Sequence, residues 1–316
     1  MLPKEYYYTK IGSSQDLIIP KERLIYRLLE TIPGILALTT LVGVFFISWQ
    51  TPIFAAFFII AFDIYWLLKT VYLSLHLRSA FKKVKENLKI NWLEKLIQNS
   101  KLEIQNWNNI YHLIVLPFYN ENFETLHASI ESLANANYPK DKMIVILAAE
   151  ERAGKPAIEI AEKIKNLFSD KFFKFLITIH PKDLADEIPG KGSNIAFAGK
   201  ISKEKIIDAL KISYGNVIVS AFDIDTVIYP DYFSRLTYVY LNTKNRQNFS
   251  YQPVPFYTNN IWPAPALARV VAFSARFWHP LQQERIERLT TFSSHSMPFQ
   301  ALINVDFWQK NMVSED

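Results

Sequence analysis

The stretch YHLIVLPF, residues 111–118, has the pattern of a buried β-strand, and three further apolar runs of similar length follow it along the chain. These runs are KMIVILAA at 142–149, FKFLITIH at 173–180 and NVIVSAF at 216–222. Amphipathic stretches with helical spacing lie between them, at 123–137 and 156–168. Strands that alternate with helices predict an α/β domain whose sheet is mostly parallel and flanked by helices. In such sheets ligands bind beyond the carboxyl ends of the strands, so the residues after each run are the candidates for a site.

Two longer apolar segments precede this domain, at residues 32–49 and from residue 53 to about residue 77. Each has a length that crosses a bilayer, which takes roughly 17 to 25 residues. A signal peptide fits less well, because a second apolar segment follows at once. We therefore expect a transmembrane hairpin within an N-terminal segment 1–77. A hydrophobic hairpin buried in a soluble core is the alternative.

The basic residues indicate how this hairpin is oriented. The turn between the two segments carries no charge, whereas basic residues lie before the first segment and after the second: Lys21, Arg23, Arg27, Arg78, Lys82, Lys83, Lys85 and Lys89. By the positive-inside rule both ends face the cytoplasm, which predicts an integral, multi-pass membrane protein with a cytoplasmic catalytic domain. Residues 78–107 read as an amphipathic interfacial helix and linker on anionic lipid. The alternative is a solvated helix packed on the next domain.

The amino-acid composition excludes several classes of protein. The 316 residues are 50% hydrophobic, which is enough to bury a full-sized core. There is no cysteine, and this excludes disulfide frameworks, thiolate nucleophiles and cysteine-ligated zinc. The net charge of +5 is explained largely by the basic residues beside the apolar segments, so nucleic acid is not an expected partner.

Polar groups follow the first two apolar runs. After the first run, Pro117 ends the ladder, the ring of Tyr119 could stack on a planar ligand, and Glu121 could accept hydrogen bonds. The alternative is that Asn120 simply caps the next helix. After the second run, Glu150 could bind the N–H edge of a base or a ribose hydroxyl, or it could lie in a solvated loop.

The segment IPGKGSNIAFA, residues 188–198, combines a glycine-containing turn with Lys191 and with Asn194 at the start of an expected helix. Backbone amides at a helix start, together with one lysine, suit a ligand that bears phosphate. The glycine spacing is not that of a Walker loop.

The segment FDIDT, residues 222–226, places two carboxylates at the end of the last apolar run. On a strand, side chains alternate between faces, so Asp223 and Asp225 would point together and Ile224 would turn toward the core. Two such carboxylates are typical ligands of Mg²⁺ or Mn²⁺ when phosphate oxygens and water complete the shell. The alternative is that both aspartates only close Asx turns.

The chain ends in VSED, and the carboxylate of Asp316 could act as a general base on a hydroxyl. A disordered acidic tail is the alternative. Taken in order, LPFYNE, GKGSN, FDIDT and VSED resemble the motifs of the membrane-bound family 2 glycosyltransferases, which include the cellulose and hyaluronan synthases. This resemblance implies that residues 108–316 form a GT-A domain, with a Rossmann-like sheet, truncated at its C-terminal end.

The resemblance implies an inverting transfer of a sugar from a nucleotide-sugar, with a UDP-sugar favoured, to an acceptor hydroxyl, and polysaccharide synthesis as one outcome. Its implied substrate-binding residues are Pro117, Tyr119, Glu121, Glu150, Lys191, Asn194, Asp223 and His295. Asp223 and Asp225 would bind the metal, and Asp316 would take the proton from the acceptor. Ser293, Ser294 and His295 lie too close together for a hydrolase relay, so His295 is expected to be an acceptor contact or a loop hydrogen bond.

The expected partners are a nucleotide-sugar donor, a glycan or lipid-linked acceptor, and membrane lipids. Two other functions fit the same motifs. A polyprenyl-phosphate glycosyltransferase would use a lipid phosphate as acceptor, and a catalytically silent membrane scaffold would keep the fold without binding a nucleotide.

Overall fold

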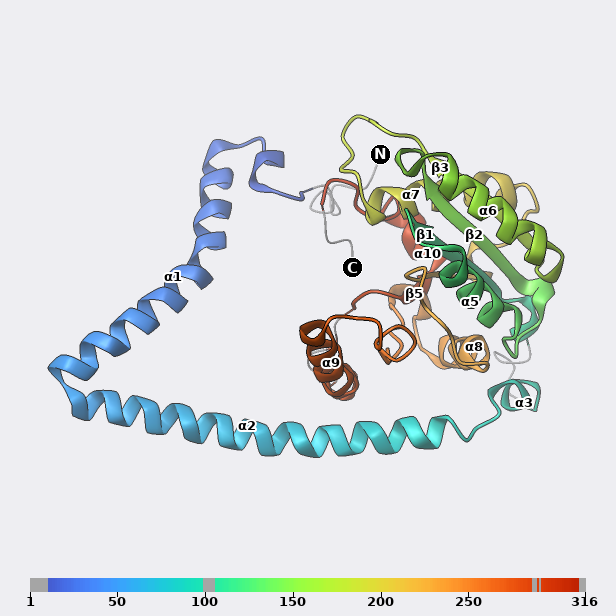
Figure 1. Cartoon of the computed structure of the whole chain (residues 1–316). Helices are drawn as coiled ribbons and strands as arrows, with labels where there is room; N and C mark the ends of the chain where they lie inside the picture. Colours follow the sequence, from blue (N-terminus) through green and yellow to red (C-terminus); the bar gives the residue numbers. More distant parts are fainter. Residues whose placement is uncertain (1–10, 99–105, 286–288, 290, 313–316) are drawn as a thin grey trace.

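The computed structural model describes residues 11–98, 106–285, 289 and 291–312, and its centre is a five-stranded sheet (Figure 1). The strand order is β3-β2-β1-β4-β5. The strands are β1 (Tyr111–Phe118), β2 (Met143–Glu150), β3 (Lys174–His180), β4 (Val217–Ala221) and β5 (His295–Pro298). The first four are parallel and β5 is antiparallel to β4. The predicted fold class, a mostly parallel sheet flanked by helices, is confirmed.

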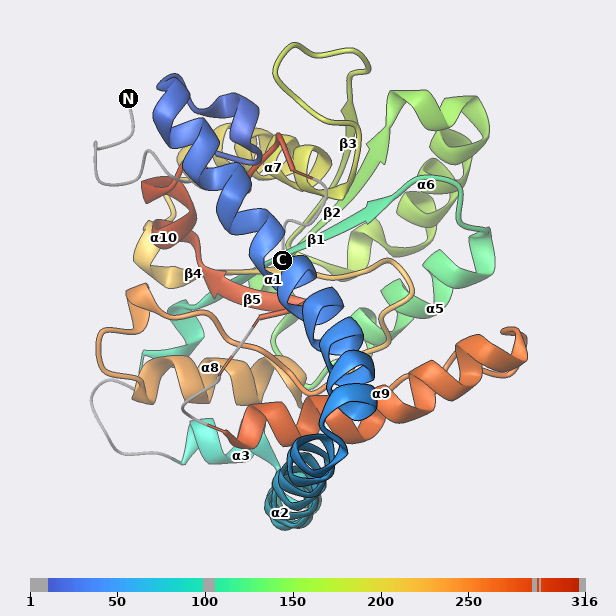
Figure 2. The ribbon, with the colours of Figure 1, turned by 90° about the vertical axis from the view of Figure 1, so that its left-hand side faces the viewer.

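The strands form as continuous apolar runs because both faces of the sheet are covered. Ile114 and Leu116 belong to the core on one face, whereas their neighbours Leu113 and Val115 belong to the core on the other. The helices of the first face are α5 (Phe123–Ala134), α6 (Gly154–Phe168) and α8 (Tyr232–Asn242), and those of the second are α7 (Lys191–Ser202) and α10 (Phe299–Asn304). Figure 2 shows these two groups on opposite sides of the strands.

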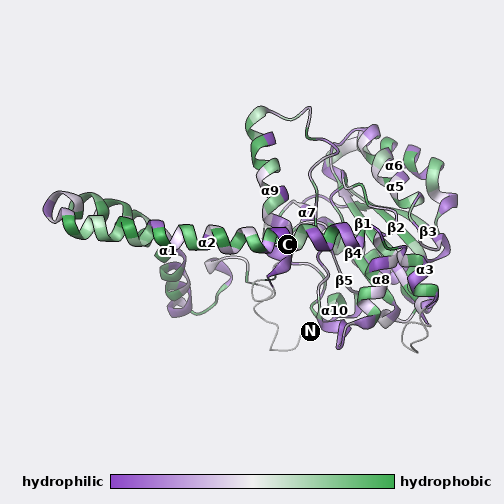
Figure 3. Cartoon of the chain, turned by 90° about the horizontal axis from the view of Figure 1, so that it is seen from below, coloured by the Kyte–Doolittle hydropathy of each residue, from purple (hydrophilic) through white to green (hydrophobic). Residues whose placement is uncertain are grey.

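Two long helices precede the sheet, α1 (Pro20–Gln50) and α2 (Pro52–Asn87). Both are long and apolar enough to cross a membrane, and in Figure 3 they are largely green. Thr51 separates them, and Pro52 is tolerated as the first residue of α2 because its missing N–H has no intrahelical partner there. In the most apolar window of each, 0% and 6% of the residues are buried. A hairpin buried in a soluble core therefore does not describe these helices.

The basic stretch that follows the second apolar segment is not a separate helix. α2 continues without a break to Asn87, because no proline or glycine interrupts residues 78–87. The short helix α3 (Trp92–Ile97) comes next, with Trp92 and Leu96 buried. The Trp92 ring lies 5.2 Å from the ring of Tyr238 on α8. This part of the stretch thus packs on the α/β domain.

One more helix, α9 (Ala266–Glu284), lies between α8 and β5 in the sequence and packs against α2. The segment that follows α9 leads to β5, which the sequence pattern did not reveal as a strand. Through β5, residues near position 295 come to lie beside the end of β4.

Candidate functional site

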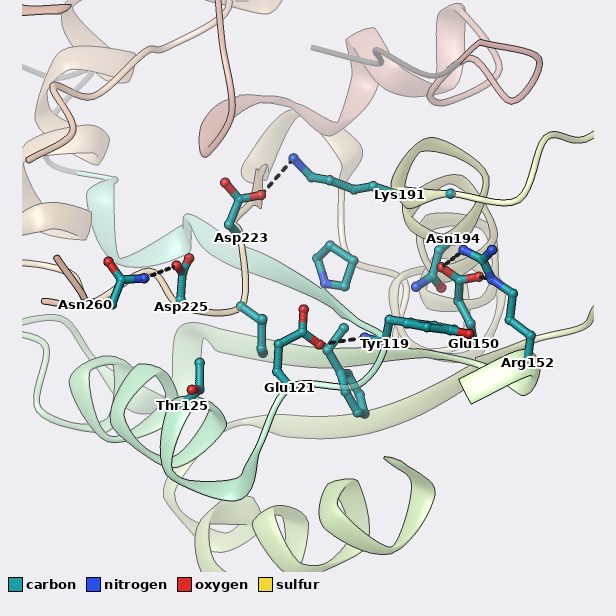
Figure 4. Close-up of a pocket in the computed structure, with 14 residues that line it drawn as sticks. Tyr119, Glu121, Thr125, Glu150, Arg152, Lys191, Asn194, Asp223, Asp225 and Asn260 are labelled. Carbon is teal, nitrogen blue, oxygen red and sulfur yellow. Dashed lines mark hydrogen bonds and ion pairs between the residues drawn. The ribbon is translucent and has the colours of Figure 1, made fainter. Parts of the chain in front are cut away.

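A cavity of about 640 Å³ opens at the carboxyl ends of β1, β2 and β4 (Figure 4). It lies where the strand order reverses, with β2 on one side of β1 and β4 on the other, and this is where α/β sheets bind ligands. The lining includes residues predicted from the sequence, namely Pro117, Tyr119, Glu121, Glu150, Lys191, Asn194, Asp223 and Asp225. It also includes Thr125, Arg152, Gly190 and Asn260, which were not predicted.

The loop after β1 is held by one of these residues. The Oε2 atom of Glu121 accepts hydrogen bonds from the backbone N–H groups of Tyr119, at 2.7 Å, and Asn120, at 3.1 Å. The helix cap is Asn122, whose Oδ1 accepts from the Thr125 N–H at 2.9 Å. Asn120 is therefore not the cap of the next helix, and Glu121 fixes the loop that carries the Tyr119 ring.

One end of the cavity combines an aromatic ring with an ion pair whose carboxylate is buried. Glu150 is only 5% exposed, and Arg152 donates to both of its carboxylate oxygens, from Nη2 to Oε1 at 3.0 Å and from Nε to Oε2. The hydrogen bond with Glu150 raises the pKa of Arg152. The guanidinium carbon of Arg152 lies 4.9 Å from the centre of the Tyr119 ring. The guanidinium thus lies over the ring, and we call this stacked pair the platform, because a planar ring can stack against it.

Asn194 lies beside this platform on the first turn of α7. Its Nδ2 donates to the Ala148 carbonyl of β2 at 2.7 Å, which fixes the orientation of the amide. Its Oδ1 is buried and has no hydrogen-bond partner within the described part of the chain. A buried acceptor without a donor is costly, so this oxygen is a ready contact for an N–H or O–H group of a ligand.

The two aspartates lie at the other end of the cavity, but the strand argument that predicted them is wrong. β4 ends at Ala221, because its pairing with β1 and β5 stops there. Asp223 instead begins a turn, in which its carbonyl accepts from the Thr226 N–H at 2.9 Å. Both Asp223 and Asp225 nevertheless line the cavity, and Ile224 is buried at 5% exposure in the core.

Asp223 is held by a lysine and two serines. Lys191 Nζ lies 3.0 Å from Asp223 Oδ1 and 2.9 Å from Ser293 Oγ, and Ser293 donates to Asp223 Oδ2. The backbone N–H of Asp223 donates to Ser294 Oγ at 3.2 Å. Ser294 has a left-handed backbone, with φ of 66°, a conformation that costs energy for a non-glycine residue and is common at functional sites. The two serines therefore belong to this site as supports of Asp223.

Asp225 is held on the other side by the segment 257–260. Its Oδ2 accepts from Asn260 Nδ2 at 2.7 Å, and its backbone carbonyl accepts from Asn259 Nδ2 at 2.6 Å. Burial raises the pKa of Asp225, the negative charge of Asp223 raises it further, and the hydrogen bond from Asn260 opposes both. Burial and these two carboxylates also raise the pKa of Tyr257. Negative charge thus accumulates at this end of the cavity.

These two carboxylates fit a divalent cation whose other coordination positions are filled by water and by a bound phosphate-bearing substrate. A cation between the cavity and the two carboxylates would relieve the repulsion that raises the pKa of Asp225. In the described ranges no group of three or more acidic or histidine side chains could hold a metal alone. Mg²⁺ and Mn²⁺ commonly bind through one or two carboxylates, with water and phosphate oxygens completing the shell.

Of the remaining predicted residues, His295 is not brought to the cavity and the other lies outside the described part of the chain. His295 is 5% exposed on β5, where it pairs with Ala221, and its Nδ1 lies 3.2 Å from the Phe292 carbonyl oxygen. This matches the loop hydrogen bond, and the acceptor contact expected of His295 is not seen because the ring is buried in the protein. Asp316, the predicted general base, lies outside the described residues.

Arg152 was missed because its contact with Tyr119 joins residues that follow two different strands. The only local signal is its position two residues after Glu150 at the end of the second apolar run. Asn260 has no comparable signal, because it reaches Asp225 from 35 residues away.

No protein-family model matches the chain, and no curated protein matches it either. The solved structures that are similar to it include the following two. The mannosyltransferase PcManGT from Pyrobaculum calidifontis, in complex with GDP-Man and Mn²⁺, is 12% identical over 77% of this chain and 61% of its own, with a TM-score of 0.42. S. aureus TarS 1-349, in complex with UDP-GlcNAc, is 15% identical over 64% of this chain and 49% of its own, with a TM-score of 0.36. A likeness this distant carries no argument about activity, which has to be inferred from the site.

Proposed function

We propose that this chain is a membrane-anchored glycosyltransferase of the GT-A type, resembling family 2, which moves a sugar from a nucleotide-sugar to an acceptor hydroxyl. The observation that carries the proposal is a single cavity with two different ends. One end has the Tyr119 and Arg152 platform, and the other has Asp223, Asp225 and Lys191. A nucleoside diphosphate has the same two halves, a flat base and a pyrophosphate that binds metal.

The base would stack on the platform of Tyr119 and Arg152. A uracil ring has one N–H donor between two carbonyl acceptors, so the free Oδ1 of Asn194 could accept from the ring N–H. Glu150 would then act mainly by holding Arg152 in place, because Arg152 already occupies both of its oxygens. This pattern favours a UDP-sugar as the donor.

The pyrophosphate would lie between the first turn of α7 and the two aspartates. Backbone amides at the start of a helix bind anions, and Gly190 leaves open space there. Asp223 and Asp225 would hold the Mg²⁺ or Mn²⁺, which supplies positive charge where the leaving diphosphate becomes more negative. Lys191 would turn from Asp223 toward a phosphate oxygen once that carboxylate has another positive partner.

The transfer itself would be a single displacement with inversion at the anomeric carbon. Asp316 is the proposed base, on the strength of the VSED motif, and would take the proton from the acceptor hydroxyl as its oxygen attacks. The bond from the anomeric carbon to the diphosphate breaks in the same step. The acceptor would be a glycan or a lipid-linked sugar, and repeated transfer would make a polysaccharide.

The catalytic domain would lie at the cytoplasmic face of the membrane. α1 and α2 would cross the bilayer, since both have the length and composition for it. The basic residues at the start of α1 and at the end of α2 would stay on the cytoplasmic side.

The test is nucleotide-sugar binding by the full chain in lipid nanodiscs, measured by calorimetry with a panel of UDP- and GDP-sugars, with and without Mn²⁺. We expect a UDP-sugar to bind more tightly with Mn²⁺, and we expect Asp223→Ala and Asp225→Ala to lose that dependence. Asp170→Ala is the matched control, because this exposed aspartate precedes β3 at the opposite edge of the sheet.

Each outcome separates the alternatives. Unchanged dependence on Mn²⁺ in both cavity variants would refute the assignment of the metal to these aspartates. Failure of the wild-type chain to bind any nucleotide-sugar would refute the glycosyltransferase and leave a silent scaffold. In a separate transfer assay with a radiolabelled UDP-sugar, label that appears only on polyprenyl phosphate would replace the hydroxyl acceptor with a lipid phosphate.

A further inference from the structure

The helix α9 carries most of its large apolar side chains on the side that faces away from the protein. Leu267, Val270 and Val271 are 82%, 64% and 69% exposed, and Trp278 is 49% exposed. These positions follow the spacing of one helical face. Trp262, just before the helix, is 79% exposed. A helix at a water-facing surface normally has the reverse arrangement.

The side of α9 that faces the protein bears smaller or polar groups. Ala272 and Ala275 are partly buried there. The His279 ring stacks on Phe292, with ring centres 4.2 Å apart, and Arg276 Nε donates to the Tyr257 carbonyl at 3.0 Å. The orientation of α9 is therefore fixed by contacts on its inner side, and its apolar face is left outward.

α9 is also joined to the end of the second long helix. The rings of Phe277 and Phe81 are 6.4 Å apart, and Glu284 Oε1 accepts from Ser79 Oγ and from Lys83 Nζ, each at 2.8 Å. These contacts lie where the apolar part of α2 gives way to its basic part. In Figure 2, α2 points toward the viewer and α9 runs across it, whereas in Figure 1 α2 lies in the plane and α9 is seen nearly end-on.

We propose that α9 is an interfacial helix, which lies in the headgroup region of the same bilayer that α1 and α2 cross. A helix that runs across α2 at the end of its apolar part lies parallel to the membrane surface when α2 spans the membrane. Tryptophans such as Trp262 and Trp278 favour this depth, and basic groups such as Arg269 and Lys82 favour anionic lipid. The bilayer is the occupant that fits this face, because the apolar surface of α2 continues into it.

The contact of α9 with the bilayer would connect the membrane surface to the cavity through a chain of hydrogen bonds. Arg276 holds the backbone of Tyr257, and the following residues Asn259 and Asn260 hold Asp225. The segment that supports one of the two aspartates is thus anchored on the helix that would rest on the lipid. The inference depends on the proposed membrane anchoring, so its test must report on both.

The chain has no cysteine, so single cysteines can be introduced without background. Nitroxide spin labels at Val270→Cys, Leu38→Cys and Asn166→Cys would be studied in nanodiscs of phosphatidylcholine with phosphatidylglycerol. Leu38 reports on α1, and Asn166, exposed on α6, is the control for a water-facing helix. Power saturation compares collisions with oxygen, which concentrates in lipid, and with a nickel chelate, which stays in water.

We expect the label at position 270 to lose most of its accessibility to the nickel chelate and to gain oxygen collisions, relative to position 166. If position 38 is in lipid but position 270 is as open to the chelate as position 166, the interfacial helix is refuted and the hairpin stands. A label at 270 shielded from both reagents would mean that protein covers this face, which also refutes the inference. If position 38 faces water too, the membrane anchoring itself fails.

Discussion

Asp225→Asn should stabilise the protein when no ligand is bound, although it removes a proposed metal ligand. The wild-type carboxylate is half-buried beside the charge of Asp223, and both conditions raise its pKa. Asparagine keeps a side-chain oxygen that can accept from Asn260, so the 2.7 Å hydrogen bond has a replacement. The substitution therefore removes the charge and leaves most of the packing unchanged.

The size of the effect follows from the exposure of the site. Relief of one unfavourable charge commonly adds roughly 0.5–2 kcal/mol, and we expect about 1 kcal/mol because solvent screens a half-exposed group. For a domain of this size, that raises Tm by roughly 2–4 °C. A raised pKa favours folding while Asp225 is protonated, and this contribution is lost as the pH rises through the folded-state pKa. The variant and the wild type should thus unfold alike below the ordinary value of 3.8 and diverge above it.

The assay is thermal unfolding in detergent micelles, followed by tryptophan fluorescence across this pH range, with Asp170→Asn as the exposed control. Mn²⁺ with a UDP-sugar should raise Tm of the wild type and raise that of Asp225→Asn much less, because ligands stabilise only the state that binds them. The reasoning is refuted if Asp225→Asn lowers Tm at neutral pH, or if its difference from wild type does not change with pH.

Three further predictions concern the site and the core. Lys191→Met removes the cation beside Asp223, so Mn²⁺ measured by electron paramagnetic resonance should bind the nucleotide-free protein more tightly, while a UDP-sugar binds more weakly; equal Mn²⁺ affinity would contradict this. Arg152→Ala leaves the buried carboxylate of Glu150 without its donor and should lower the free energy of unfolding by about 1–3 kcal/mol, with partial recovery when Glu150→Gln is added. Leu147→Ala, at a fully buried position of β2, should lower the free energy of unfolding by about 2–5 kcal/mol in urea titrations. A smaller loss would mean that neighbouring core side chains fill the space left by the leucine.

The sequence by itself determined the four parallel strands of the sheet and the two long helices. Strands buried on both faces must be apolar throughout, so the run at 111–118 gives β1 and the runs at 142–149 and 173–180 give β2 and β3 to within one residue. Because ligands bind beyond the carboxyl ends of such strands, the sequence also placed candidate ligand-binding residues at this edge of the sheet, where Tyr119 and Glu150 are found. These features depend on residues that are close together in the chain, so local patterns are enough to predict them.

Tertiary structure alone decided how that edge is completed. β4 ends before Asp223 because β5 arrives from 74 residues further on and pairs only as far as Ala221, and the same strand brings Ser293 to Asp223. The direction of the apolar face of α9 was also not predictable, since a helical pattern gives the spacing of a face but not the surroundings of that face. Contacts between distant segments fix such features, and a chain read residue by residue contains no record of which segments meet.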